Sequence, residues 1–217
     1  MLNNATADLR QLERNATSSD YVVDELLEAT NNSPIINPDA AYLANTTKID
    51  ISGLTFGNQY NSITDGVLTV TFSSPIEKRG PVPDGWLTWS SPPFSEDSNP
   101  DVLYPVGQTA LTMNLSRPVT TFGFELEPSP FAEYTFTADF YYENTLVESI
   151  TRQVSGNAGA RLFARTGEPI DRVEVTGPVE FAIAQIRYVV GMDPAHQTYI
   201  LFVVLLQLLL LSIILLG

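Results

Sequence analysis

Between Lys48 and Tyr188, short runs of alternating apolar and polar residues recur, and Gly, Pro, Asn and Asp separate them. The runs are rich in aromatic and β-branched residues, and no helical period appears among them. Strands of this length and spacing predict an all-β fold, either a sandwich or a barrel. The expected strands are Leu68–Phe72, Leu111–Leu115, Thr120–Glu127, Tyr134–Tyr142, Thr145–Val154, Arg161–Arg165, Asp171–Thr176 and Phe181–Val189.

The two faces of an expected strand differ in polarity. Phe122, Phe124 and Leu126 share one face of their strand, because side chains alternate along it. Glu125 and Glu127 fall on the opposite face. One packed face and one solvated face are typical of an antiparallel sandwich. We therefore expect the two glutamates to be exposed to water.

Three segments carry a resemblance to known domains. Pro118–Leu126 has the form P-V-x-x-F-G-F-x-L, Pro169–Val173 has the form P-I-D-x-V, and Phe181–Tyr188 reads F-A-I-A-Q-I-R-Y. In this order they resemble the secreted β-sandwich domains of bacterial PEP-CTERM-type surface proteins, over roughly Lys48–Tyr188. The resemblance implies a jelly-roll fold related to carbohydrate-binding modules. The C-terminal tail of this chain lacks the Pro-Glu-Pro sorting motif.

The last part of the chain is an uncharged apolar segment, Tyr199–Leu216, which only Gln207 and Ser212 interrupt. As a helix with a rise of about 1.5 Å per residue it would extend roughly 27 Å, close to the thickness of a bilayer's hydrocarbon core. We expect a hydrophobic C-terminal helix that anchors the protein in a membrane. A buried helix or a shifted reading frame is the alternative. No Lys or Arg follows the segment, so the sequence does not orient it.

The first part of the chain is acidic and has a weak helical pattern. Ala5–Asn15 and Asp20–Ala29 each have the pattern of a short helix, and Asn31–Asn45 has that of a linker. Helices this short are marginal alone, so the expectation is partial disorder or an arm that docks on a partner. The first thirty residues show no secretory signal, which leaves the export route open.

These features divide the chain into three parts. Residues 1–47 form a helical arm and linker, residues 48–189 form the sandwich, and residues 190–217 form a short linker and the membrane-spanning tail. The predicted fold is an all-β, antiparallel, jelly-roll-like β-sandwich with a short N-terminal helical arm and a C-terminal hydrophobic helix.

Composition excludes several chemistries. The chain has no cysteine and one histidine, His196, which rules out disulfides, thiol catalysis and Cys-ligated metals. With 25 acidic against 11 basic residues, a net charge of -14 argues against nucleic acid as a partner. No cofactor is expected, apart from the calcium ion considered below.

The longest stretch without a strand pattern, Pro81–Pro105, holds both tryptophans, Trp86 and Trp89, together with Phe94 and Tyr104. A loop of this length is often functional, and its prolines stiffen it. Aromatic rings on a rigid loop offer flat apolar platforms on which sugar rings stack. In the alternative interpretation, one or both tryptophans pack onto the sandwich.

The same loop contains four carboxylates at short spacing, Asp84, Glu96, Asp97 and Asp101. Oxygen ligands of this kind suit a hard cation such as calcium. The spacing is not that of an EF-hand, so solvated loop charges are the alternative. We state a calcium site here as a hypothesis.

Three functions are compatible with the sequence. The first is a non-catalytic, cell-surface or envelope-associated sandwich with a structural or adhesive role, whose partners are the membrane and another surface protein. The second is a carbohydrate-binding module that uses the Trp86–Tyr104 loop. The third is a glycoside hydrolase, which requires a pair of carboxylates. With 25 acids some pair is always available, so we expect no enzyme and assign no catalytic residue.

Overall fold

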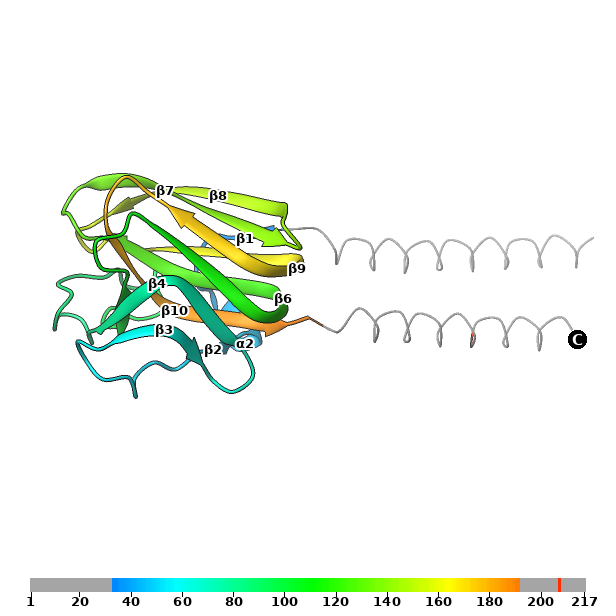
Figure 1. Ribbon diagram of the computed structural model, residues 1–217. Helices are drawn as coiled ribbons and strands as arrows, with labels where there is room; N and C mark the ends of the chain where they lie inside the picture. The colour runs from blue at the N-terminus through cyan, green and yellow to red at the C-terminus, as the bar shows by residue number, and fades with distance from the viewer. Residues whose placement is uncertain (1–32, 192–206, 208–217) are drawn as a thin grey trace, which may run out of the picture.

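The computed structural model describes residues 33–191 and Gln207 (Figure 1). The described chain is mostly strand, and one short helix, α2, lies near its beginning. In chain order the elements are β1 (Ser33–Ile35), α2 (Ala40–Asn45), β2 (Thr47–Lys48), β3 (Gln59–Thr64), β4 (Thr69–Arg79), β5 (Val102–Tyr104), β6 (Ala110–Pro128), β7 (Glu133–Tyr142), β8 (Thr145–Ser155), β9 (Arg161–Thr176) and β10 (Phe181–Val190).

All strand pairings in the described chain are antiparallel, and they join the ten strands into one continuous sheet. Its order is β2-β10-β5-β4-β6-β9-β7-β8, with β1 added beside β9, β3 added beside β4, and a further pairing between β10 and β6. The all-β, antiparallel prediction is therefore confirmed.

The long strands β6 and β9 bend, and this folds the sheet into two layers. Residues 110–115 of β6 pair with β4 and the end of β9, whereas residues 119–128 pair with β10 and the start of β9. The sequence predicted two separate strands in each case, because Pro118 and Pro169 resemble turn residues. In the structure each proline lies within one continuous strand, beside a shift in the register between β6 and β9. Each of these two strands passes from one layer to the other (Figure 1).

We call the two layers the open layer and the covered layer. The open layer contains β3, β4, the first part of β6, the second part of β9, β7 and β8. The covered layer contains β1, the first part of β9, the second part of β6, β10, β5 and β2.

The core lies between the layers and is built by the predicted apolar faces. Phe122, Phe124 and Leu126 are fully buried, as the alternation predicted. The Phe124 ring stacks on Phe163 with centroids 5.8 Å apart, and Phe136 of the open layer meets Phe181 edge-on at 5.5 Å. Burial of these large aromatic side chains supplies much of the hydrophobic stabilisation.

The expectation for Glu125 and Glu127 was wrong. Both side chains have no exposed surface, although they lie on the outer face of their strand. Residues 80–101, which we call the tryptophan loop, fold over this outer face, and α2 with β1 covers its remainder. Strand alternation predicts which side chains leave the core, but a loop distant in sequence decides whether water reaches them.

The segment expected to be a linker takes part in the fold. β1 pairs with residues 164–166 of β9, and Tyr42 of α2 is buried against Leu162 and Ala164. Asp39 caps α2 by accepting a hydrogen bond from the Tyr42 backbone N–H at 2.8 Å. The sandwich therefore extends back to Ser33.

The predicted arm helices and the predicted membrane segment Tyr199–Leu216 lie outside the described residues, apart from Gln207. Among residues 33–191 and Gln207, no helix combines the length and the apolar composition that a membrane span requires. The start of β1 and the end of β10 lie at one end of the sandwich, while the tryptophan loop lies toward the other end (Figure 1).

Candidate functional site

The two tryptophans pack onto the covered layer. Trp86 and Trp89 are 7% and 4% exposed, and Tyr104 is 7% exposed. The rings of Trp86 and Tyr104 lie 5.7 Å apart. Beneath the loop, Ala182 and Ala184 of β10 provide a floor of small side chains that lets the large rings approach the sheet. The structure therefore favours the packing alternative over an exposed platform, and ligand binding by Trp89 and Tyr104 stays a prediction.

Glu125 of β6 binds the middle of the tryptophan loop through three hydrogen bonds. Its carboxylate accepts hydrogen bonds from Trp89 Nε1 at 2.7 Å, Ser95 Oγ at 2.5 Å and the Glu96 backbone N–H at 2.7 Å. Burial raises the pKa of Glu125 to about 7, although these hydrogen bonds oppose the shift.

Glu127 fastens the first turn of the same loop. It accepts from Trp86 Nε1 at 2.7 Å, Thr88 Oγ1 at 3.2 Å and the Gly159 backbone N–H at 3.2 Å. Burial raises the pKa of this carboxyl to about 7 as well. Since the donors at Glu125 and Glu127 come mainly from the loop, the two glutamates hold it against the sheet.

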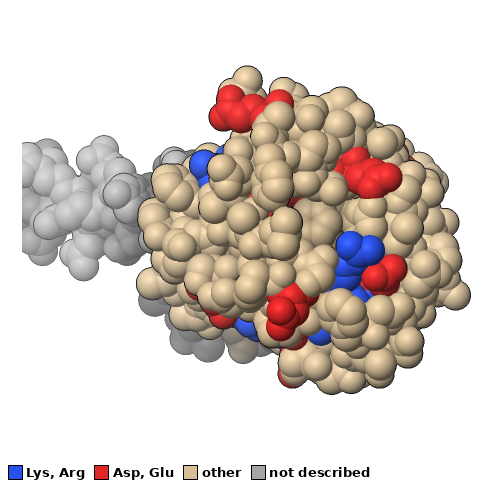
Figure 2. All heavy atoms as spheres, turned by 90° about the vertical axis from the view of Figure 1, so that its left-hand side faces the viewer, with Lys and Arg blue, Asp and Glu red and all other residues tan. Residues whose placement is uncertain are grey.

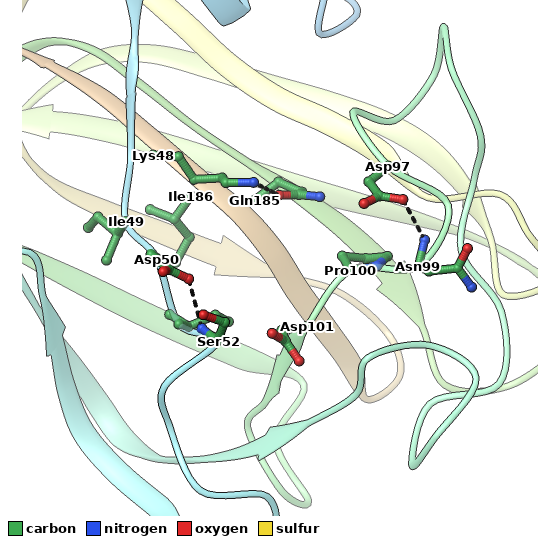
Figure 3. Close-up of a pocket in the computed structure, with 11 residues that line it drawn as sticks. Lys48, Ile49, Asp50, Ser52, Asp97, Asn99, Pro100, Asp101, Gln185 and Ile186 are labelled. Atoms are coloured by element: carbon green, nitrogen blue, oxygen red, sulfur yellow. Dashed lines mark hydrogen bonds between the residues drawn. The ribbon is translucent and has the colours of Figure 1, made fainter.

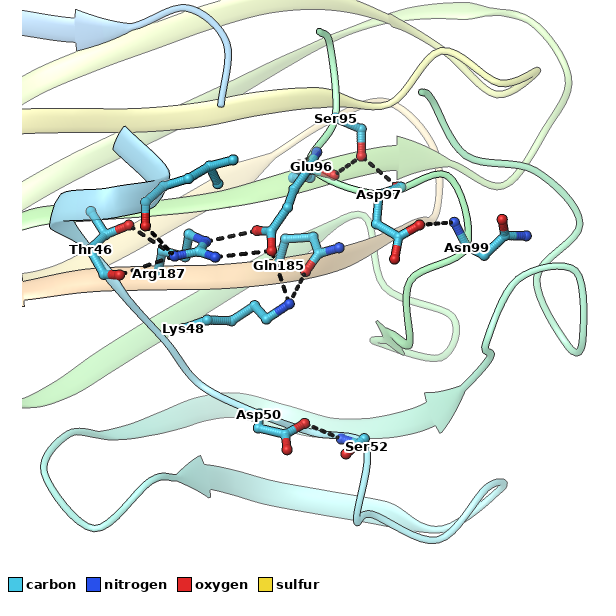
Figure 4. Close-up of polar contacts among 12 residues, drawn as sticks. Thr46, Lys48, Asp50, Ser52, Ser95, Glu96, Asp97, Asn99, Gln185 and Arg187 are labelled. Carbon is cyan, nitrogen blue, oxygen red and sulfur yellow. Dashed lines mark hydrogen bonds and ion pairs between the residues drawn. The ribbon is translucent and has the colours of Figure 1, made fainter. Parts of the chain in front are cut away.

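Glu96 and Arg187 form a third attachment of the loop (Figure 4). Arg187 donates to Glu96 through Nε at 2.7 Å and through Nη2 at 2.9 Å, and Lys48 Nζ lies 3.0 Å from the same carboxylate. Arg187 Nη1 also donates to the Thr46 carbonyl oxygen at 3.0 Å, just after α2. Burial acts to raise the pKa of Glu96, but hydrogen bonds from Arg187 and Lys48 outweigh it and hold the pKa below its usual value.

An irregularity in β10 places Arg187 on the outer face. The strand register shifts between Ala184 and Arg187, and Gln185 adopts a φ of +52°. This bulge resets the alternation, so that Ile186 enters the core and Arg187 faces the loop. The ion pair between the loop and the sheet depends on this extra residue.

The four acids of the calcium hypothesis do not come together in one site. Glu96 is engaged by Arg187, and Asp101 lies 2.6 Å from the buried Lys78. Asp97 and Asp101 line a polar pocket of about 180 Å³ with Asp50 and Gln185, whereas Asp84 does not line it (Figure 3). Within residues 33–191, no group of three or more acidic or histidine side chains could hold a metal ion. Calcium binding at these residues therefore stays a hypothesis.

A second depression, which we call the loop-end cleft, lies where the tryptophan loop meets the turns after β6 and β8. Its volume is about 270 Å³. The Leu87 and Phe131 side chains on its wall are 66% and 61% exposed. The residues that line it are Arg79, Gly85, Trp86, Leu87, Thr88, Glu127, Pro128, Ser129, Phe131 and Gly156.

Gly85 shapes one wall of the cleft. It adopts a φ of +77°, and a Cβ atom there would lie 2.7 Å from the Phe56 ring. The Phe56 side chain is itself 56% exposed. Glycine therefore permits both the turn and the approach of a third exposed apolar side chain to this end of the molecule.

Arg79 supplies the positive charge of the cleft. Its guanidinium group lies 4.5 Å above the Tyr104 ring, and its Nε donates to Glu77 at 2.9 Å. The Tyr104 hydroxyl in turn donates to Glu180. These contacts orient a charged hydrogen-bond donor next to apolar side chains. In the view toward this end, most of the visible surface is uncharged (Figure 2).

Of the four predicted ligand residues, Trp86 lines the loop-end cleft and the other three do not. Trp86 lines the loop-end cleft, while Tyr104 lies under Arg79 and Trp89 is buried on Glu125. Phe94 is 46% exposed, but Arg161 lies 4.5 Å above its ring.

Sequence reasoning missed Arg79, Leu87, Glu127 and Phe131 as residues that line the cleft. The one available signal was a large aromatic residue, Phe131, within the turn sequence PSPFAE. A short turn does not bury an aromatic side chain, so Phe131 in this position indicates a role at the surface.

No protein-family model matches the sequence, and no curated protein matches it. Similar solved structures include a family 29 carbohydrate-binding module from Piromyces equi, at 13% identity and a TM-score of 0.29, covering 59% of this chain and 98% of that one. A family 11 carbohydrate-binding module from Clostridium thermocellum, in complex with a β-1,3-1,4-mixed-linked tetrasaccharide, is similar at 10% identity and a TM-score of 0.29 over 68% and 97% of the two chains. The enzymatically active domain of tailspike protein 4 of bacteriophage CBA120 is similar at 17% identity and a TM-score of 0.27 over 69% and 20%. Likenesses of this extent assign neither a family nor a ligand to the chain.

Proposed function

We propose that this protein is a non-catalytic carbohydrate-binding module, built on a jelly-roll-like sandwich, that binds its ligand in the loop-end cleft. The observation that carries the proposal is the meeting of exposed apolar side chains, Leu87 and Phe131, with the guanidinium group of Arg79 in one cleft. A sugar ring has apolar C–H faces and polar edges, so it fits an apolar wall beside directional hydrogen-bond donors.

The frame behind the cleft supports a binding role. Glu127 holds Trp86 and Thr88, and Arg79 is stacked on Tyr104, so contacts within the protein hold this part of the cleft in place. A preformed site loses less conformational entropy on binding than a flexible one.

The same geometry disfavours the hydrolase alternative. The buried glutamates Glu125 and Glu127 have raised pKa values, as a general acid requires, but their oxygens already accept hydrogen bonds from the loop. Glycoside hydrolysis needs carboxylates on both sides of a reachable bond. A structural function for the two glutamates accounts for their contacts, and we propose no catalytic residue.

We further propose that the module acts at the cell surface or envelope, where a structural or adhesive role would follow from glycan binding. The position of the tryptophan loop, which lines the cleft, supports this proposal, because the loop lies toward the end of the sandwich away from the start of β1 and the end of β10 (Figure 1).

A glycan array with the full chain and a Leu87→Ala, Phe131→Ala double variant tests the proposed function. Both side chains are exposed, so we expect the variant to fold and to lose at least tenfold in affinity for any glycan bound by the parent. Leu146→Ala is the matched control, since Leu146 is 51% exposed on β8 and does not line the cleft. Equal binding by parent and double variant, or no binding to any glycan, would contradict the proposal.

A further inference from the structure

We infer that the loop-end cleft recognises the end of a glycan chain, with about one sugar ring inside, and does not bind along the chain. This inference rests on the proposed function. Three surfaces of the described sandwich differ in what they offer to several consecutive sugars: the outer faces of the two layers and the loop-end cleft.

The outer face of the covered layer offers no room for a chain. Its side chains Glu125, Glu127, Ala182 and Ala184 have no exposed surface, because the tryptophan loop lies on them. The loop is attached through both glutamates and through the pair of Arg187 with Glu96. A glycan would have to break these contacts to reach the sheet.

The outer face of the open layer is accessible but lacks an apolar surface for sugar rings. Its rows carry short polar side chains, for example Thr71 beside Asn114 and Thr137 beside Thr151, whose hydroxyl oxygens lie 2.9 Å apart. The Tyr141 ring on this face is overlaid by the Arg172 guanidinium group at 4.5 Å. Of the exposed large apolar side chains in the described chain, only Leu146 of β8 lies on a strand of the open layer.

The loop-end cleft is a small depression that is open to solvent on one side. Its volume of about 270 Å³ is below the roughly 300–1,000 Å³ of pockets that hold drug-sized ligands. Leu87 and Phe131 stand on its wall, and the buried Glu127 lies at its inner side. A site of this size at the tip of the sandwich holds on the order of one ring, and the remaining sugars of the chain extend into water.

The experiment uses isothermal titration calorimetry to measure the protein's affinity for saccharides of increasing length. The probes are saccharides of one to six units of glucose, mannose, galactose and N-acetylglucosamine, in the linkages that the array identifies. We expect the dissociation constant to change by less than threefold between the disaccharide and the hexasaccharide. A decrease of tenfold or more with length would overturn the inference and leave the proposed function standing.

Two variants test where on the protein the glycan chain binds. Phe131→Ala is expected to weaken binding of the disaccharide and of the hexasaccharide by the same factor, whereas Tyr141→Ala on the open layer leaves both unchanged. Loss of hexasaccharide binding in Tyr141→Ala alone would place the chain on the open layer and overturn the inference. Absence of binding by every saccharide would overturn the proposed function, and this inference would fall with it.

Discussion

At the scale of single residues, the buried glutamates Glu125 and Glu127 are the least expected feature of the molecule. Their position on the outer face of β6 was readable from the sequence, but their burial was not, because it depends on a loop more than twenty residues earlier in the chain. Their hydrogen-bond donors are mostly uncharged, so burial dominates the pKa of both.

These pKa values predict how stability depends on pH. The folded pKa of about 7 for each glutamate lies above the ordinary value of 4.5, so the folded protein binds protons more tightly than the unfolded chain between those values. The stabilisation that these two carboxyl groups contribute is therefore fully present below about pH 4.5 and is lost as the pH rises to about 7. We expect urea titrations to give a higher free energy of unfolding at pH 5 than at pH 8.

The Glu125→Gln, Glu127→Gln double variant tests the origin of this pH dependence. Gln does not titrate, so the difference between pH 5 and pH 8 should largely disappear. Glu133→Gln is the matched control, since Glu133 is exposed, and it should keep the parent's slope. A double variant with the same slope as the parent would assign the pH dependence to other groups.

Tyr42 offers a second prediction at this scale. Its hydroxyl is buried without a hydrogen-bond partner in the described structure and lies where a Cβ on Gly123 would come within 2.3 Å. Removing an unsatisfied buried hydroxyl should stabilise the protein, so we expect Tyr42→Phe to raise the free energy of unfolding by about 1 kcal/mol. Tyr188→Phe should lower it, because the Tyr188 hydroxyl donates to Asp65 at 2.6 Å. Destabilisation by Tyr42→Phe would show that the hydroxyl has a partner.

At the scale of elements, the attachment of the tryptophan loop to β10 and α2 depends on Arg187 and Glu96. Both side chains are largely buried, at 11% and 14% exposure, and they share two hydrogen bonds. Arg187→Lys keeps the charge but loses the paired geometry, and we expect it to cost about 1–3 kcal/mol in urea unfolding. Lys48→Gln should cost less than about 0.5 kcal/mol, because Lys48 is 40% exposed. Equal costs for the two variants would contradict this assignment.

The strands were largely predictable because each expected segment has a period of two. What the sequence did not reveal is that two pairs of segments are single strands, β6 and β9, bent at Pro118 and Pro169. A proline near a polar residue has the sequence pattern of a turn, both where the chain reverses direction and where a continuous strand only bends. The short strands β1, β2 and β5 were missed because two or three residues carry no periodicity.

At the scale of the whole molecule, the loop-end cleft joins the tryptophan loop, the start of the β6–β7 turn and the region after β8. Trp86 was predicted as a ligand residue from its local sequence, and it does line the cleft. Its partners Glu127 and Phe131 come from elements distant in sequence, so only the fold brings them together with Trp86. No local pattern in a single sequence encodes such a combination.

The central claim is that ligands bind in the loop-end cleft, and NMR titration of the full chain tests it directly. With the saccharide that binds best on the array, we expect backbone amide shifts concentrated at residues 85–88, 129–131 and 156, with little change at Thr71, Asn114 and Thr137. Shifts concentrated on those three open-layer residues, with the cleft unchanged, would contradict the claim.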